Sequence, residues 1–324
     1  MHPSDVLFQG MHQPVSLPAC DHYAGSEKLM RKSMLLQQQL GPVFDITFDC
    51  EDGAAAGNER AHAALVGELI AGDENRFGRI GARVHEPGSE HFEPDLAAIL
   101  GRAAQRLAYV VIPKVDSVLQ LRDAIATVRR HAEAAGRTAL LPVHVLVETH
   151  GALHEVWEIA ALPEVECLSF GIMDFVSAHY GGIPASAMKS PGQFSHPLVM
   201  RAKLEIAAAC HAHGIVASHN VCTEIRDLSV VANDAAQAAR ELGYGRMWSI
   251  HPDQVRPILD AFTPDEQEID DAVAILCAAQ KNDWGPIQHD GKLHDRASYR
   301  YYWTVLQRAR KNGHALPEQV EALT

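Results

Sequence analysis

Two acidic residues near the middle of the chain have the types and the spacing of a shared metal site. Glu148 ends the apolar run VLVE and Asp174 ends the run SFGIMD, about one strand–helix–strand step later. This spacing predicts carboxylates at the same end of neighbouring parallel strands, roughly 4.8 Å apart. Two such carboxylates can share a hard cation such as Mg²⁺, which takes oxygen ligands and keeps positions open for substrate. The pair therefore predicts a metal-dependent enzyme that acts on a small, oxygen-rich anion.

The elements that would position this pair are apolar runs rich in β-branched residues, which we predict to be strands. They are 14–18, 43–49, 80–85, 109–115, 143–148, 167–174, 214–219 and 247–252. Segments with helical spacing of apolar residues, such as 58–71 and 117–136, lie between them. Alternation of this kind implies parallel pairing, and eight units favour a closed (β/α)₈ TIM barrel over an open doubly wound sheet. No GxGxxG opens a helix, which further weakens a dinucleotide-binding alternative.

Three segments follow from this pattern. Residues 1–13 form an N-terminal segment, expected to be disordered or tag-like because VLFQG resembles a protease-site remnant. Residues 14–262 form the barrel, which we expect to be the catalytic domain. Residues 263–324 form a C-terminal helical extension that is too short to fold alone. It is therefore expected to lie on its own barrel or to contact a neighbouring subunit.

The composition indicates which kinds of partner and which cellular compartment to expect. The formal net charge is −13 without any block of Lys and Arg, so nucleic acid is not expected as a partner. No apolar run approaches the roughly 20 residues that span a bilayer, so no membrane association is expected. The six cysteines show no CxxC spacing and lie mostly in apolar segments, which predicts buried free thiols in a reducing cytoplasm.

In a barrel, the active site forms at the C-terminal ends of the strands, and the unusual polar residues of this chain fall there. They are Asp49, Glu51, Asp52, Arg83, His85, Lys114, Glu148, Asp174, Ser218, His219, Asn220 and His251. Arg83 lies in an apolar strand, where an unpaired charge is expensive, so we predict a functional partner for it.

Ordinary structural roles compete with these assignments. Lys114 could be a strand-end lysine that reaches to water, and Asp52 before Gly53 could be a turn residue. His251 could be a hydrogen-bonded residue at a helix start. The corresponding alternative for Glu148 and Asp174 is a pair of strand-end carboxylates held by helix caps or salt bridges.

The stretch FDCEDG (48–53) resembles the D-x-E-D-[AG] motif of the citrate lyase β-subunit and malyl-CoA lyase family, within the HpcH/HpaI aldolase group. Further matches follow in family order over roughly residues 26–310. They are RVHEPG, IPKVDS, VETHGAL, FGIMDF, ELGYGRMWSIHPDQV and AFTPDEQEI. The resemblance implies a (β/α)₈ barrel that binds Mg²⁺, or Mn²⁺ in its place, through Glu148 and Asp174.

The same resemblance assigns roles to the other strand-end residues. Arg83 would bind the carbonyl and carboxylate oxygens of the substrate and act in catalysis. Asp49, Glu51 and Asp52 would hold metal-bound waters or support Arg83. Asp49 and Glu51 are also candidates for catalysis, and Asp52 and Lys114 are further candidates for substrate binding.

The malyl-CoA lyase branch also carries a C-terminal G-K-x-x-D segment, which here is GKLHD (291–295). In that branch the aspartate matching Asp295 reaches the active site of an adjacent subunit as acid/base. The resemblance therefore implies a homo-oligomer, most simply a homotrimer or a homohexamer.

Two stretches depart from the family pattern. The family's first strand reads R-S-x-L-[FY]-V-P-G, and its arginine helps to hold CoA, whereas residues 12–29 contain no arginine. Lys28 and Arg31 could replace this phosphate contact, or their helix could be an ordinary solvated face. The usual D-G-[VP] after the seventh strand is replaced by SHNV (218–221).

These observations predict a Mg²⁺-dependent carbon–carbon lyase acting on a 3-hydroxyacyl-CoA thioester such as malyl-CoA or citramalyl-CoA. Its products would be acetyl-CoA or propionyl-CoA and a 2-oxo acid, glyoxylate or pyruvate, formed through a stabilised enolate. Three alternatives use related chemistry. They are a malate-synthase-like condensing enzyme with thioester hydrolysis, a CoA-independent aldolase of 2-oxo acids, and a citrate lyase β-type subunit that works inside a complex.

Overall fold

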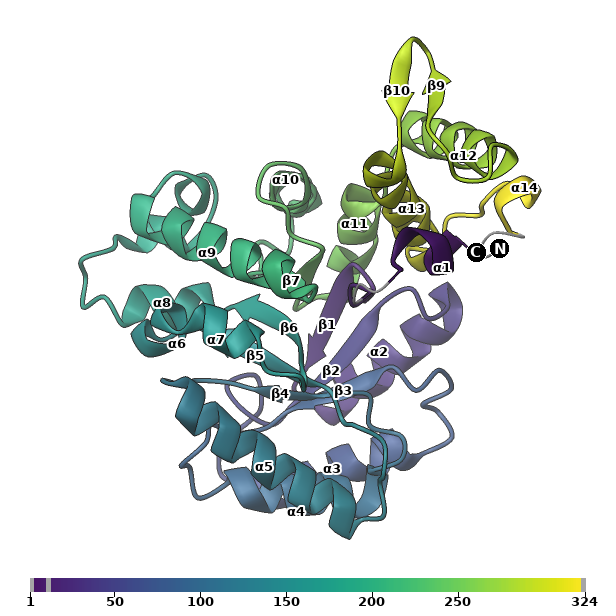
Figure 1. Cartoon of the computed structure of the whole chain (residues 1–324). Coiled ribbons are helices and arrows are strands. Elements are labelled where there is room, and N and C mark those ends of the chain that lie inside the picture. Colours follow the sequence, from purple (N-terminus) through teal and green to yellow (C-terminus); the bar gives the residue numbers. More distant parts are fainter. Residues whose placement is uncertain (1–2, 10–12, 322–324) are drawn as a thin grey trace.

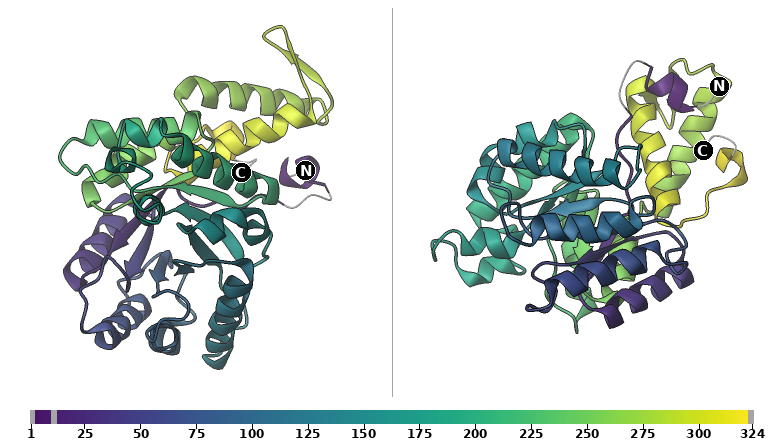
Figure 2. Two further views of the ribbon diagram at one scale, coloured as in Figure 1. Left: turned by 90° about the vertical axis from the view of Figure 1, so that its left-hand side faces the viewer. Right: turned by 90° about the horizontal axis from the view of Figure 1, so that it is seen from below.

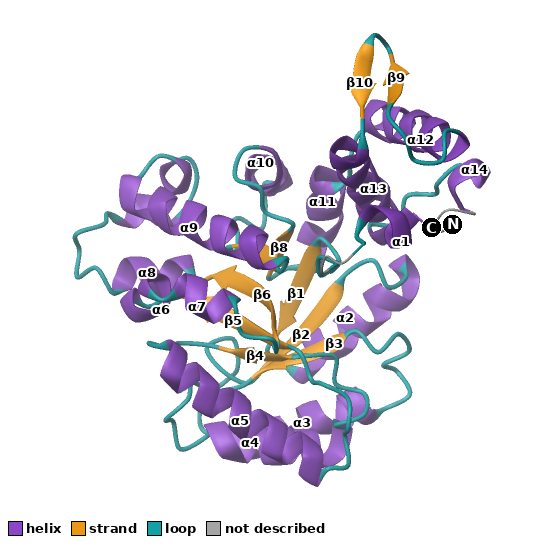
Figure 3. Ribbon diagram, in the orientation of Figure 1, coloured by secondary structure: helices purple, strands orange, loops and turns teal. Residues whose placement is uncertain are grey.

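The structure is a computed structural model that describes residues 3–9 and 13–321. Eight parallel strands form a closed barrel in chain order, and pairing of the first strand with the eighth closes it. The strands are β1 (Cys20–Ala24), β2 (Asp45–Asp49), β3 (Ile80–Arg83), β4 (Val110–Ile112), β5 (Val143–Val147), β6 (Val165–Phe170), β7 (Val216–His219) and β8 (Arg246–Ser249). Figure 1 and Figure 3 show the strands in the centre, surrounded by helices. The predicted (β/α)₈ barrel is confirmed.

The helices cover the outside of the barrel, and the main apolar core lies between them and the strands. They are α2 (Glu27–Leu40), α3 (Glu59–Ala71), α4 (Phe92–Ala103), α5 (Val118–Ala134), α6 (His150–His154), α7 (Val156–Ala160), α8 (Ile172–Ser177), η1 (Ala185–Met188), η2 (Gly192–Phe194), α9 (Pro197–His213), α10 (Leu228–Arg240) and α11 (Pro252–Phe262). Side-chain caps fix several starts. Ser26 accepts a hydrogen bond from the Leu29 N–H, and Ser117 accepts one from the Gln120 N–H.

The first strand is not where the sequence pattern predicted it. Residues 14–18 lie outside the sheet, and β1 is the polar stretch Cys20–Ala24. Pro14 and Pro18 have no N–H to donate to a strand ladder, which disfavours the apolar run PVSLP as a strand. β1 tolerates polar residues because their partners are buried with them. For example, His22 Nδ1 lies 2.9 Å from the Ser249 hydroxyl of β8.

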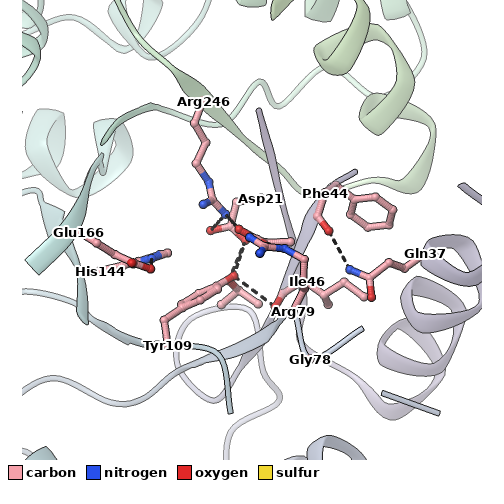
Figure 4. A network of polar contacts seen from close by, with 12 residues as sticks. Asp21, Gln37, Phe44, Ile46, Gly78, Arg79, Tyr109, His144, Glu166 and Arg246 are labelled. Atoms are coloured by element: carbon pink, nitrogen blue, oxygen red, sulfur yellow. Dashed lines mark hydrogen bonds and ion pairs between the residues drawn. The ribbon is translucent and has the colours of Figure 1, made fainter. Parts of the chain in front are cut away.

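Charged residues fill the N-terminal end of the barrel, where a layer of branched apolar side chains is usual. The Arg246 guanidinium is fully buried and lies 3.1 Å from the Asp21 carboxylate and 2.8 Å from that of Asp45. Thr47 donates a hydrogen bond to Asp21. The Tyr109 hydroxyl also contacts Asp21 (Figure 4). Burial opposes the charge of Arg246, but Asp21 and Asp45 hold its pKa well above the usual value. This network closes the barrel opposite the predicted site.

The C-terminal extension has an apolar core of its own. It contains α12 (Glu266–Lys281), β9 (Ile287–His289), β10 (Lys292–His294), α13 (Arg296–Lys311) and α14 (Glu318–Glu321). The N-terminal helix α1 (Pro3–Leu7) joins this core through the buried Val6 and Leu7. The hairpin β9–β10, not foreseen from the sequence, turns at Asp290 and Gly291, which both have positive φ as a two-residue type I′ turn requires. Figure 2 shows it projecting from the extension.

Two further findings concern predictions made above. The six cysteines are free thiols, and all but the partly buried Cys277 are buried. Among the residues that the structure describes, no helix combines the length and apolar character needed to cross a bilayer.

A buried lysine lies between α9 and β7. Lys203 Nζ is 2.8 Å from Gln193 Oε1 and 2.8 Å from His219 Nε2, and it lies 4.2 Å from the centre of the Phe194 ring. Among the described residues, Asp234 is the only acid whose charge opposes this burial by raising the pKa of Lys203. Burial therefore lowers the pKa of Lys203 from 10.5 to about 7.

This shift predicts a pH-dependent stability difference between the parent protein and Lys203→Met. The unfolded chain keeps the Lys203 proton up to its ordinary pKa, whereas the folded chain releases it above about 7. The free energy of unfolding of the parent should therefore rise relative to that of the variant between pH 7 and 9, by at most about 1.4 kcal/mol per pH unit. Urea unfolding across this range measures the difference. Lys189→Met, which changes an exposed lysine nearby, is the control, and a pH-independent difference for Lys203→Met would contradict the prediction.

Candidate active site at the barrel mouth

Arg83 and two acidic residues form a buried ion cluster at the C-terminal ends of β2 and β3. Arg83 pairs with Asp49 in the strand register, and its Nε and Nη2 donate to the two Asp49 oxygens at 2.7 and 2.5 Å. Nη1 lies 2.8 Å from Glu51 Oε2. Burial opposes the charge of Arg83, but Asp49 and Glu51 hold its pKa above the usual value. The predicted charged partner of Arg83 is therefore a pair of carboxylates from β2 and the loop after it.

Asp49 also fixes the loop that carries Glu51. Its two oxygens accept hydrogen bonds from the backbone N–H groups of Glu51 and Gly53, at 3.0 and 2.9 Å. Gly53 is required at this position, because a Cβ there would lie 2.2 Å from Asp49 Oδ2. One carboxylate thus orients both the arginine and the DCEDG loop.

Lys114 links this cluster to Glu148. Its backbone N–H donates to Glu148 Oε1 at 2.8 Å, and Lys114 has a left-handed φ of 51°. Its ammonium group contacts Glu51 and lies 2.9 Å from Asp52 Oδ2. These two carboxylates outweigh the effect of burial and raise the pKa of Lys114. A strained, non-glycine conformation at this position is consistent with a functional constraint.

Glu148 and Asp174 lie close together, as their spacing predicted, but one follows a strand and the other lies in a helix. Glu148 directly follows β5, whereas β6 ends at Phe170 and Asp174 lies in the first turn of α8. The strand prediction 167–174 is therefore wrong in its last residues, since the chain turns into a helix at Gly171. Burial, and then the charge of Asp174, raise the pKa of Glu148 to about 8.

The chemistry of this pair fits Mg²⁺. Both residues supply oxygen donors, and they are close enough for Asp174 to raise the pKa of Glu148. A bound cation would offset their repulsion. Within the described residues there is no cluster of three or more His, Cys, Asp or Glu side chains able to hold a metal. An ion held by Glu148 and Asp174 would therefore take its remaining ligands from water and substrate, as Mg²⁺ commonly does.

Two aromatic contacts of this site were not singled out by the sequence analysis, whereas His85 was among its strand-end residues. The Arg83 guanidinium lies 5.6 Å from the centre of the Tyr23 ring and 5.5 Å from that of Trp248. His85 forms a 2.7 Å contact with Asp95. The two-residue alternation from Asp21 to Tyr23 would have placed Tyr23 inside the barrel, had the first strand been located correctly.

Other predicted residues lie elsewhere. Lys28 is exposed on α2, and Arg31 is paired with Glu27 and Glu74 at 2.9 and 3.0 Å. Asp295 is the exposed N-cap of α13, and its hydrogen bonds within the described residues are all with residues 297–299. The structure of one chain therefore does not bring these residues to the barrel mouth.

The residues after β7 and β8 have structural contacts. His219 faces Lys203 outside the barrel, and Asn220 donates to Gln193 Oε1 at 2.9 Å. His251 caps α11 by accepting a hydrogen bond from the Asp253 N–H. The capping alternative considered for His251 is thus the observed arrangement.

Comparison with known proteins agrees with the geometry. Residues 31–252 match the HpcH/HpaI aldolase/citrate lyase family. The chain belongs to this family. It is similar to L-malyl-CoA/beta-methylmalyl-CoA lyase of Cereibacter sphaeroides, with 30% identity over 279 residues that cover 82% of this chain and 86% of the relative. It is a carbon–carbon lyase of the citrate lyase β/malyl-CoA lyase type.

Solved structures share the fold over most of their length. A citrate lyase from Burkholderia xenovorans LB400 is 56% identical, covers 100% of both chains and superposes with a TM-score of 0.87. The protein CitE of Mycobacterium tuberculosis is 22% identical, covers 91% of this chain and 99% of its own, and has a TM-score of 0.67. At that identity, the second likeness concerns the fold alone.

The packing of Gly171 against Glu148 generates a prediction for this lyase. A Cβ at Gly171 would lie 2.1 Å from Glu148 Oε2 and 2.6 Å from its Cβ, so Gly171→Ala must displace the carboxylate. We expect Mg²⁺ affinity, measured by titration calorimetry, to fall by about 10- to 100-fold. Gly101→Ala in α4 is the matched control, because a Cβ there meets no atom within 4 Å. Parent-like Mg²⁺ affinity in Gly171→Ala would show that Mg²⁺ binding does not require the Glu148 carboxylate in its observed position.

Proposed function

We propose that this lyase uses Mg²⁺ to cleave a 3-hydroxyacyl-CoA thioester such as malyl-CoA or citramalyl-CoA. The products are acetyl-CoA or propionyl-CoA and glyoxylate or pyruvate. The observation that carries the proposal is the juxtaposition, at one barrel mouth, of the Glu148–Asp174 pair and the fixed Arg83 guanidinium, linked through Lys114 and Glu51. Cleavage of the bond between the α and β carbons develops negative charge on the enolate and on the oxo-acid oxygens. A cation held by Glu148 and Asp174 and the Arg83 guanidinium would both stabilise this charge.

Glu148 and Asp174 would hold the metal, which when bound would supply Lewis-acid polarisation of the oxo-acid oxygens. Asp49 accepts hydrogen bonds from two of the five N–H donors of Arg83, and Glu51 forms an ion pair with Nη1, so donors on Nη1 and Nη2 are left for substrate. These carboxylates fix the plane of the guanidinium, so its free donors need no reorganisation during the reaction. The Lys114 ammonium group contacts both Glu51 and Asp52 and so holds these two carboxylates beside the guanidinium.

Asp295 is our candidate acid/base, contributed by a neighbouring subunit. In its own chain it lies in the extension between β10 and α13, two elements that Figure 1 shows away from the strands of the barrel. Its carboxylate is exposed, as a group that must reach a second chain requires. We therefore propose a homotrimer or homohexamer in which the extension of one subunit completes the site of the next.

The relatives support the choice of substrate class. The Cereibacter sphaeroides relative is named for malyl-CoA and beta-methylmalyl-CoA. The Mycobacterium tuberculosis relative was solved in complex with magnesium, acetoacetate and coenzyme A. We extend these ligand classes to this chain as part of the proposal.

A second candidate is a CoA-independent aldolase of 2-oxo acids, favoured by one observation. Arg31, the proposed substitute for the family's phosphate-binding arginine, is already paired with Glu27 and Glu74. Calorimetric titration with acetyl-CoA separates the two candidates. Binding supports the thioester lyase, and no binding up to millimolar concentration contradicts it.

The metal ligands provide the direct test of the proposed reaction. The purified protein with Mg²⁺ is incubated with a panel of 3-hydroxyacyl-CoA thioesters, and the released oxo acid is identified by mass spectrometry. Glu148→Gln and Asp174→Asn should each lower Mg²⁺-dependent turnover by about a hundredfold or more, because each removes a charged ligand. Glu158→Gln, an exposed residue of α7, is the control. Parent-like rates in either ligand variant would exclude the metal site.

The subunit assignment of Asp295 predicts complementation. Asp295→Asn and Glu148→Gln should each be inactive alone, but co-expressed mixed oligomers should recover activity in about a quarter of their sites, since these combine an intact Glu148 with the Asp295 of a neighbour. Differently tagged chains allow the mixed species to be isolated and assayed. Full activity of Asp295→Asn alone, or no recovery in the mixture, would contradict a role for Asp295 across subunits.

A further inference from the structure

Besides Glu51 Oε2, which is ion-paired with Arg83, two polar atoms beside Arg83 are buried without a hydrogen-bond partner among the described residues. They are the Tyr23 hydroxyl of β1 and the Trp248 indole Nε1 of β8. Neither belongs to the ion cluster of Asp49, Glu51 and Lys114. An unmade hydrogen bond at a buried donor is costly in a protein interior, and unpaired groups of this kind call for an explanation.

Both residues lie inside the barrel, where β1 and β8 close it. Asp21 pairs with Trp248 in the strand register, and Tyr23 follows two positions later on the same face. The Tyr23 and Trp248 rings stack with 4.3 Å between their centres and 36° between their planes. The Arg83 guanidinium lies within 6 Å of both ring centres, which is close enough for a cation–π contact.

The exposure of Trp248 differs from that of the residues against which it packs. Trp248 packs against Tyr109, Val111 and Leu146, which are almost completely buried inside the barrel. Trp248 is only partly buried, so part of its side chain is accessible to solvent. The Arg246–Asp21–Asp45 network closes the opposite end of the barrel. The accessible part of Trp248 therefore lies toward the mouth, and the ring pair forms a floor beneath Arg83.

We infer that Trp248 and Tyr23 bind the 2-oxo acid released in the proposed reaction and determine its size. The indole N–H can only donate, and the phenol O–H can donate, so the pair is suited to the carboxylate and carbonyl oxygens of such an acid. The ring faces offer an apolar surface for a small substituent such as the methyl group of pyruvate. This inference rests on the proposed function and adds two residues from β1 and β8 to its substrate site.

The test measures binding as well as turnover. Pyruvate and glyoxylate are titrated calorimetrically, with saturating MgCl₂, into the parent protein, Tyr23→Phe and Trp248→Phe. Each substitution should weaken binding of at least one acid by about tenfold or more, the range expected when a site loses one hydrogen bond to a charged group. In the condensing direction, KM for the oxo acid should rise while KM for the acyl-CoA stays unchanged. Tyr301→Phe and Trp157→Phe, which change exposed rings, are the matched controls.

Thermal unfolding separates a binding role from a structural one. Tyr23→Phe removes a hydroxyl that has no partner in the protein, so its melting temperature should equal or exceed that of the parent. This inference is overturned if the parent protein binds the oxo acids and cleaves the thioester, and both variants keep the parent's affinity and KM for the oxo acids. The proposed function then remains intact. If the parent protein binds neither acid and cleaves no thioester, the proposed function fails and the inference fails with it.

Discussion

The ion pair between Arg83 and Asp49 is the interaction on which the arrangement of the barrel mouth depends. It joins β2 and β3 at a register pair and is completed by Glu51, so an arginine is held in a fixed plane inside the protein. Asp49 also accepts two backbone hydrogen bonds from the loop that presents Glu51 and Asp52. Lys114 then ties this loop to Glu148. A charge cluster that is fully paired can be buried, and its geometry is then set by many contacts at once.

Buried and paired charges also occupy the opposite, N-terminal end of the barrel. Arg246 lies between Asp21 and Asp45, and Arg79 donates to Asp45 at 2.6 Å. Most (β/α)₈ barrels fill this space with apolar layers, whereas here ion pairs lie at both ends of the barrel, and Thr47 and Tyr109 bind to Asp21 of the Arg246 network. Each buried charge needs an opposite charge on a neighbouring strand. The strand register is therefore determined by charge pairing as well as by apolar burial.

Much of this architecture was predictable from the sequence because its signals are local. Apolar β-branched runs indicated seven of the eight strands, and apolar residues at helical spacing indicated helices between them. The strand β1 was missed because Asp21, His22 and Tyr23 find their partners on distant strands, and a single segment gives no sign of them. The hairpin β9–β10 was missed because its strands are only three residues long.

The sequence by itself determined the barrel class, the residues at the strand ends and, through its motifs, the family. It identified Glu148, Asp174 and Arg83 because acidic and basic residues that end apolar runs are expensive without a role. Only the tertiary structure decided how these residues are paired, which acids occupy Arg83 and which aromatic rings lie beneath it. It also placed Asp295 in the extension, between β10 and α13. These are contacts between segments far apart in the chain, and their energies depend on burial and distance that no local pattern contains.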